Sequence, residues 1–262
     1  MRVFMVFLLT LCAFGNYSLS AEETQDSNQT LRILAYNIRH GRGMDDKIDI
    51  ERIANVISKT NADLVALQEV DKNCNRSGNQ DIAALLGEML GMEHRFEKLM
   101  DYDGGDYGLA ILSRFPVLDS KRHEFPDTAK SLFAMEVMVI PEGYSEPVSF
   151  LSIHNDWRDE GLRVRQVEAL LSGLKERTGP VILSGDFNTL PDGASLALLL
   201  EAGWKMLEKE GDKVTFPADV PDREIDFFFI LNFPDITTHH VVIEEKVASD
   251  HRPIYAEIVL NE

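Results

Sequence analysis

The sequence predicts a single α/β domain built on mixed β-sheets, and three observations support this fold class. Short apolar runs of strand length alternate along the chain with segments whose apolar residues recur at helical spacing. Neither a long linker nor a low-complexity segment divides the 262 residues. A hydrophobic fraction of 44% supplies enough apolar side chains for one sizeable core.

Eight apolar runs are predicted to be β-strands, because they are short, rich in β-branched or aromatic residues and bounded by turn formers. They are residues 31–37, 64–67, 108–112, 132–140, 148–153, 181–184, 225–230 and 254–260. Pro141-Glu142-Gly143 is a strong turn signal between two of these runs. The strands on either side of that turn are therefore predicted to form a hairpin.

Four segments are predicted to be helices that pack on the sheets. Ile50, Ile53 and Ile57 repeat at helical spacing behind Asp49, which is a suitable N-cap residue. A second helix over residues 82–90 is expected to end at a glycine C-cap. The other two predicted helices cover residues 167–174 and 196–200.

The beginning of the chain has the pattern of a secretory signal peptide over residues 1–20. Arg2 gives it a positive start, an apolar run too short to span a bilayer follows, and small residues stand at positions 18–20. We expect cleavage after Ser20, a flexible leader over residues 21–30, and one folded domain over residues 31–262. This predicts a secreted or periplasmic protein with no transmembrane span in its mature chain.

Charge and cysteine content exclude several classes of protein. The formal net charge is −18, which argues against tight binding of duplex nucleic acid because phosphate contacts need basic side chains. Only Cys74 would remain after cleavage of the signal peptide, so no intramolecular disulfide could form. Stability is therefore expected to come from the core or from a bound metal.

Polar side chains follow directly after several of the predicted strands, where a sheet edge can bring them together. Asn37, Glu69, His154 and Asp186 each stand at such a strand end. Some of these sets, such as Gly185-Asp186-Phe187-Asn188, consist of turn formers and could simply be turns. The position alone therefore leaves both a structural and a functional explanation open.

Two further polar sets occur late in the chain. Asp226 interrupts an apolar run, and a carboxylate in that position must be paired with a donor, a cation or a histidine to offset its desolvation. Ser249-Asp250-His251 precedes the last predicted strand. These three residues are consecutive, so their side chains cannot converge as a catalytic triad if the segment is extended.

The polar residues as a set favour hydrolysis assisted by a divalent metal ion. They offer several oxygen ligands, which Mg²⁺ prefers, and Mn²⁺ is an alternative ion. No cysteine and histidine cluster at zinc spacing is present, and no Gly-x-Ser-x-Gly elbow surrounds Ser184. A glycine-rich phosphate loop followed by Lys-Ser or Lys-Thr is also missing, which disfavours an ATPase.

The order of these motifs resembles that of the endonuclease/exonuclease/phosphatase superfamily of metal-dependent phosphoesterases. The resemblance runs from about residue 31 to residue 260 and rests on six motifs in the family's order. They are Tyr36-Asn37-Ile38, Gln68-Glu69-Val70, His154, Gly185-Asp186-Phe187-Asn188, Ile225-Asp226-Phe227 and Ser249-Asp250-His251. Residues 37–41 and Gly105-Asp106-Tyr107-Gly108 also look like secreted bacterial members. One departure is Asn155, where many members have leucine.

The resemblance implies a four-layered α/β sandwich, in which two mixed sheets pack face to face with helices outside. It also implies a cleft at the strand ends with a divalent ion, which is Mg²⁺ or alternatively Mn²⁺. Glu69 would hold this ion, Asn37 would assist, and Asp250 would complete the metal environment. Selectivity would reside in the loops over residues 72–80, 99–107, 155–162 and 211–223.

The same resemblance implies a role for each of the remaining motif residues. Asp186 would orient or deprotonate the attacking water, and Asn188 would help to position that water. Asp226 would pair with His251, which would bind or protonate the scissile phosphate. His154 would stabilise the charge that develops on the phosphoryl oxygens.

Four basic side chains are further candidates for contacts with the substrate phosphate, because arginine binds phosphate oxygens well. They are Arg39, His40, Arg76 and Arg163. An isolated arginine is commonly a solvated surface residue, so this assignment has a plain structural alternative.

The leading hypothesis is a secreted, monomeric, Mg²⁺-dependent phosphoric ester hydrolase. Its substrate would be a phosphodiester or phosphomonoester of a small molecule or a lipid headgroup. A secreted endonuclease or exonuclease is the second hypothesis, although the acidic charge argues against it. A catalytically inactive binding protein with the same fold is the third, because fold alone does not establish function.

Overall fold

The computed structural model describes residues 30–125 and 133–261. The predicted signal peptide lies outside the described residues, as does the predicted leader up to residue 29. Thr30, which the sequence assigned to the leader, is instead the first residue of strand β1 (Thr30–Asn37). Within the described residues, no helix is long and apolar enough to cross a membrane.

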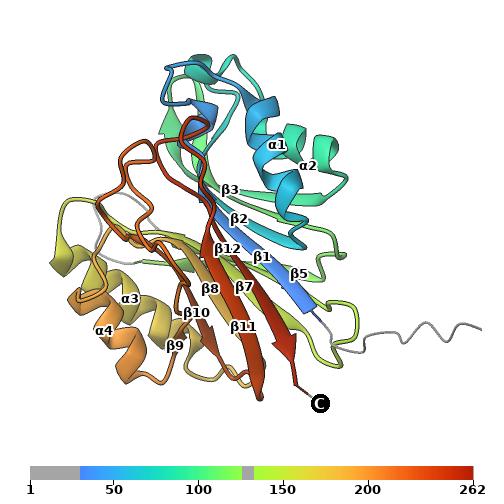
Figure 1. Cartoon of the computed structure of the whole chain (residues 1–262), viewed down its shortest axis with the longest axis vertical. Coiled ribbons are helices and arrows are strands. Elements are labelled where there is room, and N and C mark those ends of the chain that lie inside the picture. The colour runs from blue at the N-terminus through green and yellow to red at the C-terminus, as the bar shows by residue number, and fades with distance from the viewer. Residues whose placement is uncertain (1–29, 126–132, 262) are drawn as a thin grey trace, which may run out of the picture.

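Two six-stranded sheets form the centre of the molecule (Figure 1). The first has the order β11 (Ile236–Val242), β12 (Ile254–Leu260), β1, β2 (Leu64–Lys72), β4 (Gly105–Ser113) and β3 (Glu93–Tyr102). The second has the order β5 (Asp119–Glu124), β6 (Phe133–Val139), β7 (Val148–His154), β8 (Val181–Asp186), β10 (Asp226–Leu231) and β9 (Lys205–Met206). The pairs β1–β2 and β7–β8 are parallel and the other pairs are antiparallel, so both sheets are mixed.

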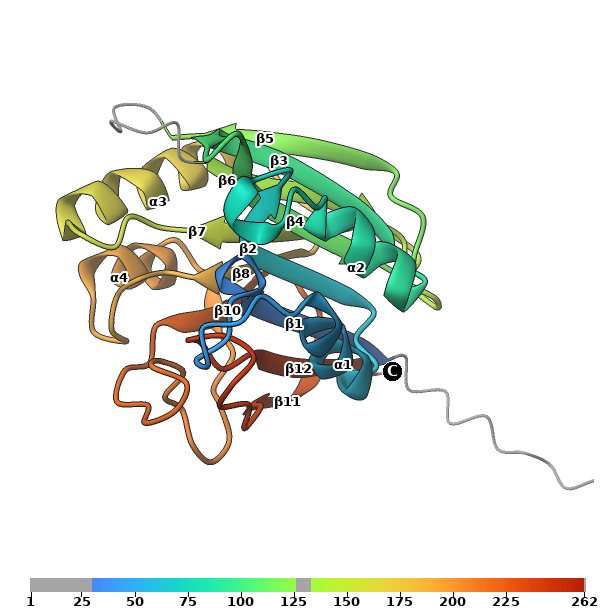
Figure 2. The same ribbon diagram turned by 90° about the horizontal axis from the view of Figure 1, so that it is seen from above.

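Helices cover the outer face of each sheet, which completes four layers (Figure 2). Helices α1 (Ile50–Thr60) and α2 (Ile82–Leu90) pack on the first sheet, and α3 (Glu160–Leu174) and α4 (Ala194–Glu201) pack on the second. Between the sheets lies a shared core that includes Ile33, Phe150 and Phe228. Two short 3-10 helices cover Arg39–Gly41 and Asn75–Ser77. The four-layered α/β sandwich that the sequence predicted is therefore confirmed.

Local signals in the sequence mark where the helices begin and end. The Asp49 side chain accepts a hydrogen bond from the backbone of Arg52, as a helix N-cap does. Gly91 closes α2 with a φ of 63°, in the left-handed region that glycine adopts without strain. Helix α3 begins at Glu160, well before the predicted residue 167. The sequence pattern missed its first turns because they are polar and carry no apolar repeat.

The eight predicted strands are the inner strands of the two sheets, and the sequence missed the four edge strands β3, β5, β9 and β11. An edge strand is paired on one side only and tolerates polar residues on much of its surface. Strand β3 contains no fully buried residue, and β5 and β11 contain one each. These segments therefore lack the apolar runs by which the inner strands were recognised.

Candidate active site

Four polar side chains stand at strand termini along one edge of the sandwich. Asn37, His154 and Asp186 are the last residues of β1, β7 and β8. Asp226 is the first residue of β10, where it pairs in register with Asp186, rather than an interior residue of a strand. The two sheets thus deliver amide, imidazole and carboxylate groups to the same place.

Glu69 reaches this edge from a β-bulge. Strand β2 does not end at Glu69, as the sequence suggested, but continues to Lys72 with a register shift between Leu67 and Val70. Glu69 has a φ of 57°, and such a bulge re-aims a side chain relative to its neighbours. The Asn37 Nδ2 atom lies 3.2 Å from Glu69 Oε1, so the first two motifs meet.

Asp186 lies at the centre of the polar cluster. Its Oδ2 atom is 3.2 Å from Asn37 Nδ2, 3.5 Å from His154 Nε2 and 3.6 Å from His251 Nε2. Its Oδ1 atom accepts a hydrogen bond of 2.9 Å from the backbone N–H of Asn188. Burial raises the pKa of the Asp186 carboxyl, and the nearby charge of His251 opposes this rise. Asp186 is therefore a carboxylate held in place from four directions.

Asp226 and His251 lie within hydrogen-bonding distance, which is the pairing that the family resemblance implied. The His251 Nδ1 atom is 3.0 Å from Asp226 Oδ2, and the Thr215 hydroxyl donates to the same oxygen at 2.5 Å. Burial lowers the pKa of His251, but the charges of Asp226 and Asp186 outweigh it and raise the pKa to about 10. The imidazole is therefore cationic at neutral pH, and its Nε2–H faces Asp186.

A cleft of about 490 Å³ opens above this cluster. Its lining includes six of the predicted site residues, namely Glu69, His154, Asp186, Asn188, Asp250 and His251. Asn37 and Asp226 are not part of the lining; both are buried and contact residues that are. Three of the four loops expected to govern selectivity also contribute to the lining, the exception being residues 72–80.

The acidic side of the cleft fits a divalent cation. Among the described residues, no lysine, arginine or histidine nitrogen lies within 4.0 Å of the Glu69 carboxylate. Asp250 faces the same cleft, and burial together with the charge of Glu69 raises the pKa of its carboxyl. Arg39 Nε is 3.4 Å from Asp250. The Glu69 and Asp250 carboxylates are the oxygen donors that Mg²⁺ prefers.

A second group could also hold a metal ion. Ligand atoms of Asp186, Asp226 and His251 all lie within 4.8 Å of one another. Asp226 Oδ2 already accepts from Thr215 and His251, however, so an ion here would displace existing hydrogen bonds. The donor set around Glu69 therefore suits a Mg²⁺ ion better. The Asn37 amide would have to turn to act as a ligand, because its oxygen accepts from the backbone N–H of Arg39.

The four basic residues predicted to contact phosphate do not line the cleft. Arg76 is committed to Asp71 through hydrogen bonds of 2.7 and 2.8 Å, and Arg163 pairs with Glu160 at 2.6 Å. Arg39 faces Asp250, and His40 is a buried residue whose pKa is lowered to about 4 by that burial. The three arginines therefore each have a carboxylate partner, whereas the buried His40 Nδ1 atom has no hydrogen-bond partner among the described residues.

Sequence reasoning missed two arginines that do line the cleft, Arg158 and Arg223. Both follow or precede a recognised motif by a few residues, and that proximity was the available signal. Reasoning from sequence also missed Thr215 and Lys209, both of which hydrogen-bond to Asp226. Lys209 Nζ donates to the Asp226 carbonyl oxygen at 2.7 Å.

Solved structures with the same fold come from bacteria and from animals. A functionally unknown conserved protein from Enterococcus faecalis matches with a TM-score of 0.73 and 19% identity, covering 88% of this chain and 100% of that one. A mannosyl-6-phosphatase from Bacteroides thetaiotaomicron has a TM-score of 0.69 and 16% identity, with coverages of 88% and 100%. Humanized TDP2 from D. rerio has a TM-score of 0.69 and 21% identity, with coverages of 88% and 99%.

The family model described as endonuclease/exonuclease/phosphatase matches residues 34–251. This range contains all six motifs as well as the central strands that carry the polar cluster. From its first motif to its last, the chain belongs to the endonuclease/exonuclease/phosphatase family.

Proposed function

We propose that this protein is an exported, Mg²⁺-dependent phosphoesterase that hydrolyses a small-molecule phosphoester or a lipid headgroup. The observation that carries the proposal is the position of Asp186, with one carboxylate oxygen within 3.6 Å of the Nε2 atoms of both His154 and His251. A carboxylate between two imidazoles at the floor of a cleft suits hydrolysis of a phosphoester by water. The mannosyl-6-phosphatase among the structural neighbours supports a small substrate.

The cleft is suited to an in-line attack, in which the water oxygen bonds to phosphorus, the bond from phosphorus to the leaving oxygen breaks, and the leaving oxygen takes up a proton from solvent. Asp186 accepts a hydrogen bond from the attacking water and receives its proton, while Asn188 helps to position that water. His251, held cationic by Asp226, donates its Nε2–H to a phosphoryl oxygen. His154 donates to a second phosphoryl oxygen and so stabilises the negative charge that grows there.

Glu69 and Asp250 are the residues that would hold the divalent ion, with Asn37 beside them. When bound, Mg²⁺ supplies positive charge that stabilises the phosphoryl oxygens in the transition state. The bulge keeps Glu69 facing the cleft, and Asn37 links Glu69 to Asp186 by two contacts of 3.2 Å. The Glu69 and Asp186 carboxylates are thereby kept at a fixed separation.

A phosphoester panel tests this function. Phosphomonoesters, phosphodiesters, phospholipids and oligonucleotides are incubated with the purified protein, with Mg²⁺ or with a chelator. We expect hydrolysis of a small phosphoester or lipid that requires the metal. Asp186→Asn should lower kcat by about a thousandfold. Asp192→Asn is a matched control, since Asp192 is an exposed carboxylate outside the cleft.

Two outcomes would contradict the proposal. If the protein hydrolyses no compound in the panel, the proposed hydrolase function is wrong. If hydrolysis persists in the presence of a chelator, the proposed metal requirement is wrong. Hydrolysis confined to oligonucleotides would establish the nuclease alternative instead.

A further inference from the structure

Two large apolar side chains stand exposed on the rim of the cleft. Trp157 is 72% exposed and Leu190 is 48% exposed, and both belong to the cleft lining. Exposed tryptophan at the edge of a concave site is typical of a surface that binds a ligand, since it buries a large area with little entropy loss. Trp157 lines the same cleft as His154 and Asp186, so a ring bound to it would lie in the cleft that takes the phosphate.

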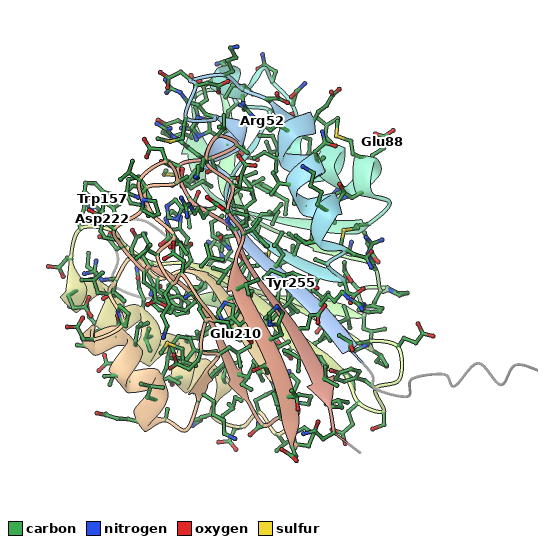
Figure 3. The ribbon with its side chains drawn as sticks, in the orientation of Figure 1. Arg52, Glu88, Trp157, Glu210, Asp222 and Tyr255 are labelled. Carbon is green, nitrogen blue, oxygen red and sulfur yellow. The ribbon has the colours of Figure 1, made fainter. Side chains whose placement is uncertain are left out.

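Two loops at the mouth of the cleft each carry an arginine packed against an aromatic ring. On the loop between β7 and α3, the Arg158 guanidinium carbon lies 5.9 Å from the centre of the Trp157 ring. On the loop between β9 and β10, the Arg223 guanidinium carbon lies 4.4 Å from the centre of the Phe216 ring. Figure 3 labels Trp157 and Asp222, the neighbour of Arg223, at the same margin of the molecule. All four residues of the two pairs line the cleft.

The pair of Phe216 and Arg223 also contacts the catalytic residue His251. The Phe216 ring lies 4.8 Å from the His251 ring, centre to centre. A group packed against Phe216 is therefore close to the histidine that faces Asp186. We call Trp157, Arg158, Phe216 and Arg223 the mouth residues.

Two arginines stand at the mouth of the cleft, each paired with an aspartate. The chain is strongly acidic, whereas the mouth presents two guanidinium groups. Arg158 pairs with Asp156 at 2.8 Å, and Arg223 pairs with the exposed Asp222 at 3.5 Å. Guanidinium planes stack well on aromatic rings, and such stacking does not require that the arginines give up their carboxylate partners.

We propose that the mouth residues bind the leaving group, so that the enzyme prefers small phosphoesters whose leaving alcohol carries an aromatic ring. This inference rests on the proposed phosphoesterase function and narrows its substrate class. Two aromatic rings and two guanidinium planes recognise the face of a flat ring, whereas an acyl chain presents no such face. The ring would lie between the two loops while the phosphate lies over Asp186 and His251.

Three substrates isolate the contribution of the ring. Benzyl, cyclohexylmethyl and n-butyl phosphate all release primary alcohols, so the part of the difference in kcat/KM that Trp157→Ala removes reports on recognition of the leaving group. Each is assayed as a phosphomonoester and as its methyl phosphodiester. We expect the benzyl ester to have a kcat/KM about tenfold above those of the two others.

Two variants connect this preference to the mouth. Trp157→Ala should reduce the preference for the benzyl ester to about twofold or less. Val220→Ala is a matched control, because Val220 is 75% exposed on the same loop as Arg223 but does not line the cleft. This control should retain the full preference.

A binding measurement tests the inference without relying on catalysis. Benzylphosphonate cannot be hydrolysed, and the chain has two tryptophans, of which Trp204 is buried and Trp157 is exposed. Benzylphosphonate should quench the fluorescence of Trp157, and butylphosphonate should not. The quenching should disappear in Trp157→Phe and remain in Val220→Ala.

The outcomes separate the two proposals. Hydrolysis of all three esters at equal kcat/KM, with no quenching, would overturn the inference and leave the phosphoesterase function standing. Absence of any hydrolysis would overturn the function, and in that case quenching by benzylphosphonate alone decides whether the mouth binds a ring. A preference for long-chain phospholipids over the benzyl ester would also overturn the inference.

Discussion

The contact between Asp226 and His251 should make the two residues act as one unit in turnover. The two side chains are 4% and 6% exposed, and 3.0 Å separates Asp226 Oδ2 from His251 Nδ1. Asp226→Asn keeps the shape of the side chain but removes the negative charge that favours the imidazolium. His251→Ala removes the Nε2–H that faces Asp186. Each change therefore disables the same donor.

The size of the effect follows from the burial of this pair. A buried hydrogen bond between charged groups contributes about 3 kcal/mol, so Asp226→Asn should lower kcat by about a hundredfold. His251→Ala also loses the contact with phosphate, and its kcat should fall by about a thousandfold. The double variant should be no more than about threefold slower than His251→Ala, because a group that has already been removed cannot be oriented.

The assay is a double-mutant cycle on kcat with the best substrate of the phosphoester panel. Far-ultraviolet circular dichroism and urea denaturation of each variant establish that the fold is kept. Additive losses, near 10⁵-fold in the double variant, would show that the two residues act independently. The coupling assigned to the pair would then be wrong.

Three further predictions concern the metal, the core and the start of the chain. Glu69→Gln should weaken binding of Mg²⁺ or Mn²⁺ in calorimetric titration by about tenfold or more, since it removes a charged ligand; unchanged affinity would move the ligand role to Asp186 or Asp250. Glu136 is buried, and although burial opposes it, hydrogen bonds to His123 at 2.6 Å and the charge of Arg177 lower its pKa. A lowered folded-state pKa stabilises the protein at neutral pH, and this contribution is lost as the pH falls below about 5. Glu136→Gln should therefore lower the free energy of unfolding, measured by urea denaturation at pH 7, by about 3 kcal/mol. On acidification the variant should lose less of this free energy than the wild type, and an equal loss would refute the assignment. Mass spectrometry of exported protein should find an N-terminus near residue 21, and a soluble cytoplasmic protein that retains Met1 would refute export.

The sequence predicted the inner strands because burial on both faces requires continuous apolar runs. Strand β8, for example, is buried along its whole length and reads as an apolar run before Gly185. Strand β3 lies at a sheet edge, and its sequence alternates charged residues with a few apolar ones. Such a segment resembles a loop until its partner strand is known, since pairing with β4 rather than composition creates it.

The polar cluster was predictable for a different reason. Carboxylates and histidines that directly follow buried strands must find partners, and Asp226 signalled this need most clearly because it breaks an apolar run. The bulge at Glu69 was not predictable, because the extra residue becomes visible only from the pairing of β2 with β4. The pairing of Arg76 with Asp71 was not predictable either, since nothing in the sequence marks Asp71 as its partner.

Substitutions at strand ends and substitutions in loops should have different effects on turnover. Asn37, His154 and Asp186 are fixed by strands that hydrogen-bond on both sides, so the positions of their side chains leave little room for adjustment. Trp157 and Arg223 lie on loops, where residue type can change without disturbing a sheet. Changes at the strand ends should therefore alter kcat for every substrate, whereas changes at the mouth should alter the ratio of kcat/KM between substrates. If a substitution in one of these loops lowered kcat equally for all esters, the substituted residue would act in catalysis and not in recognition of the leaving group.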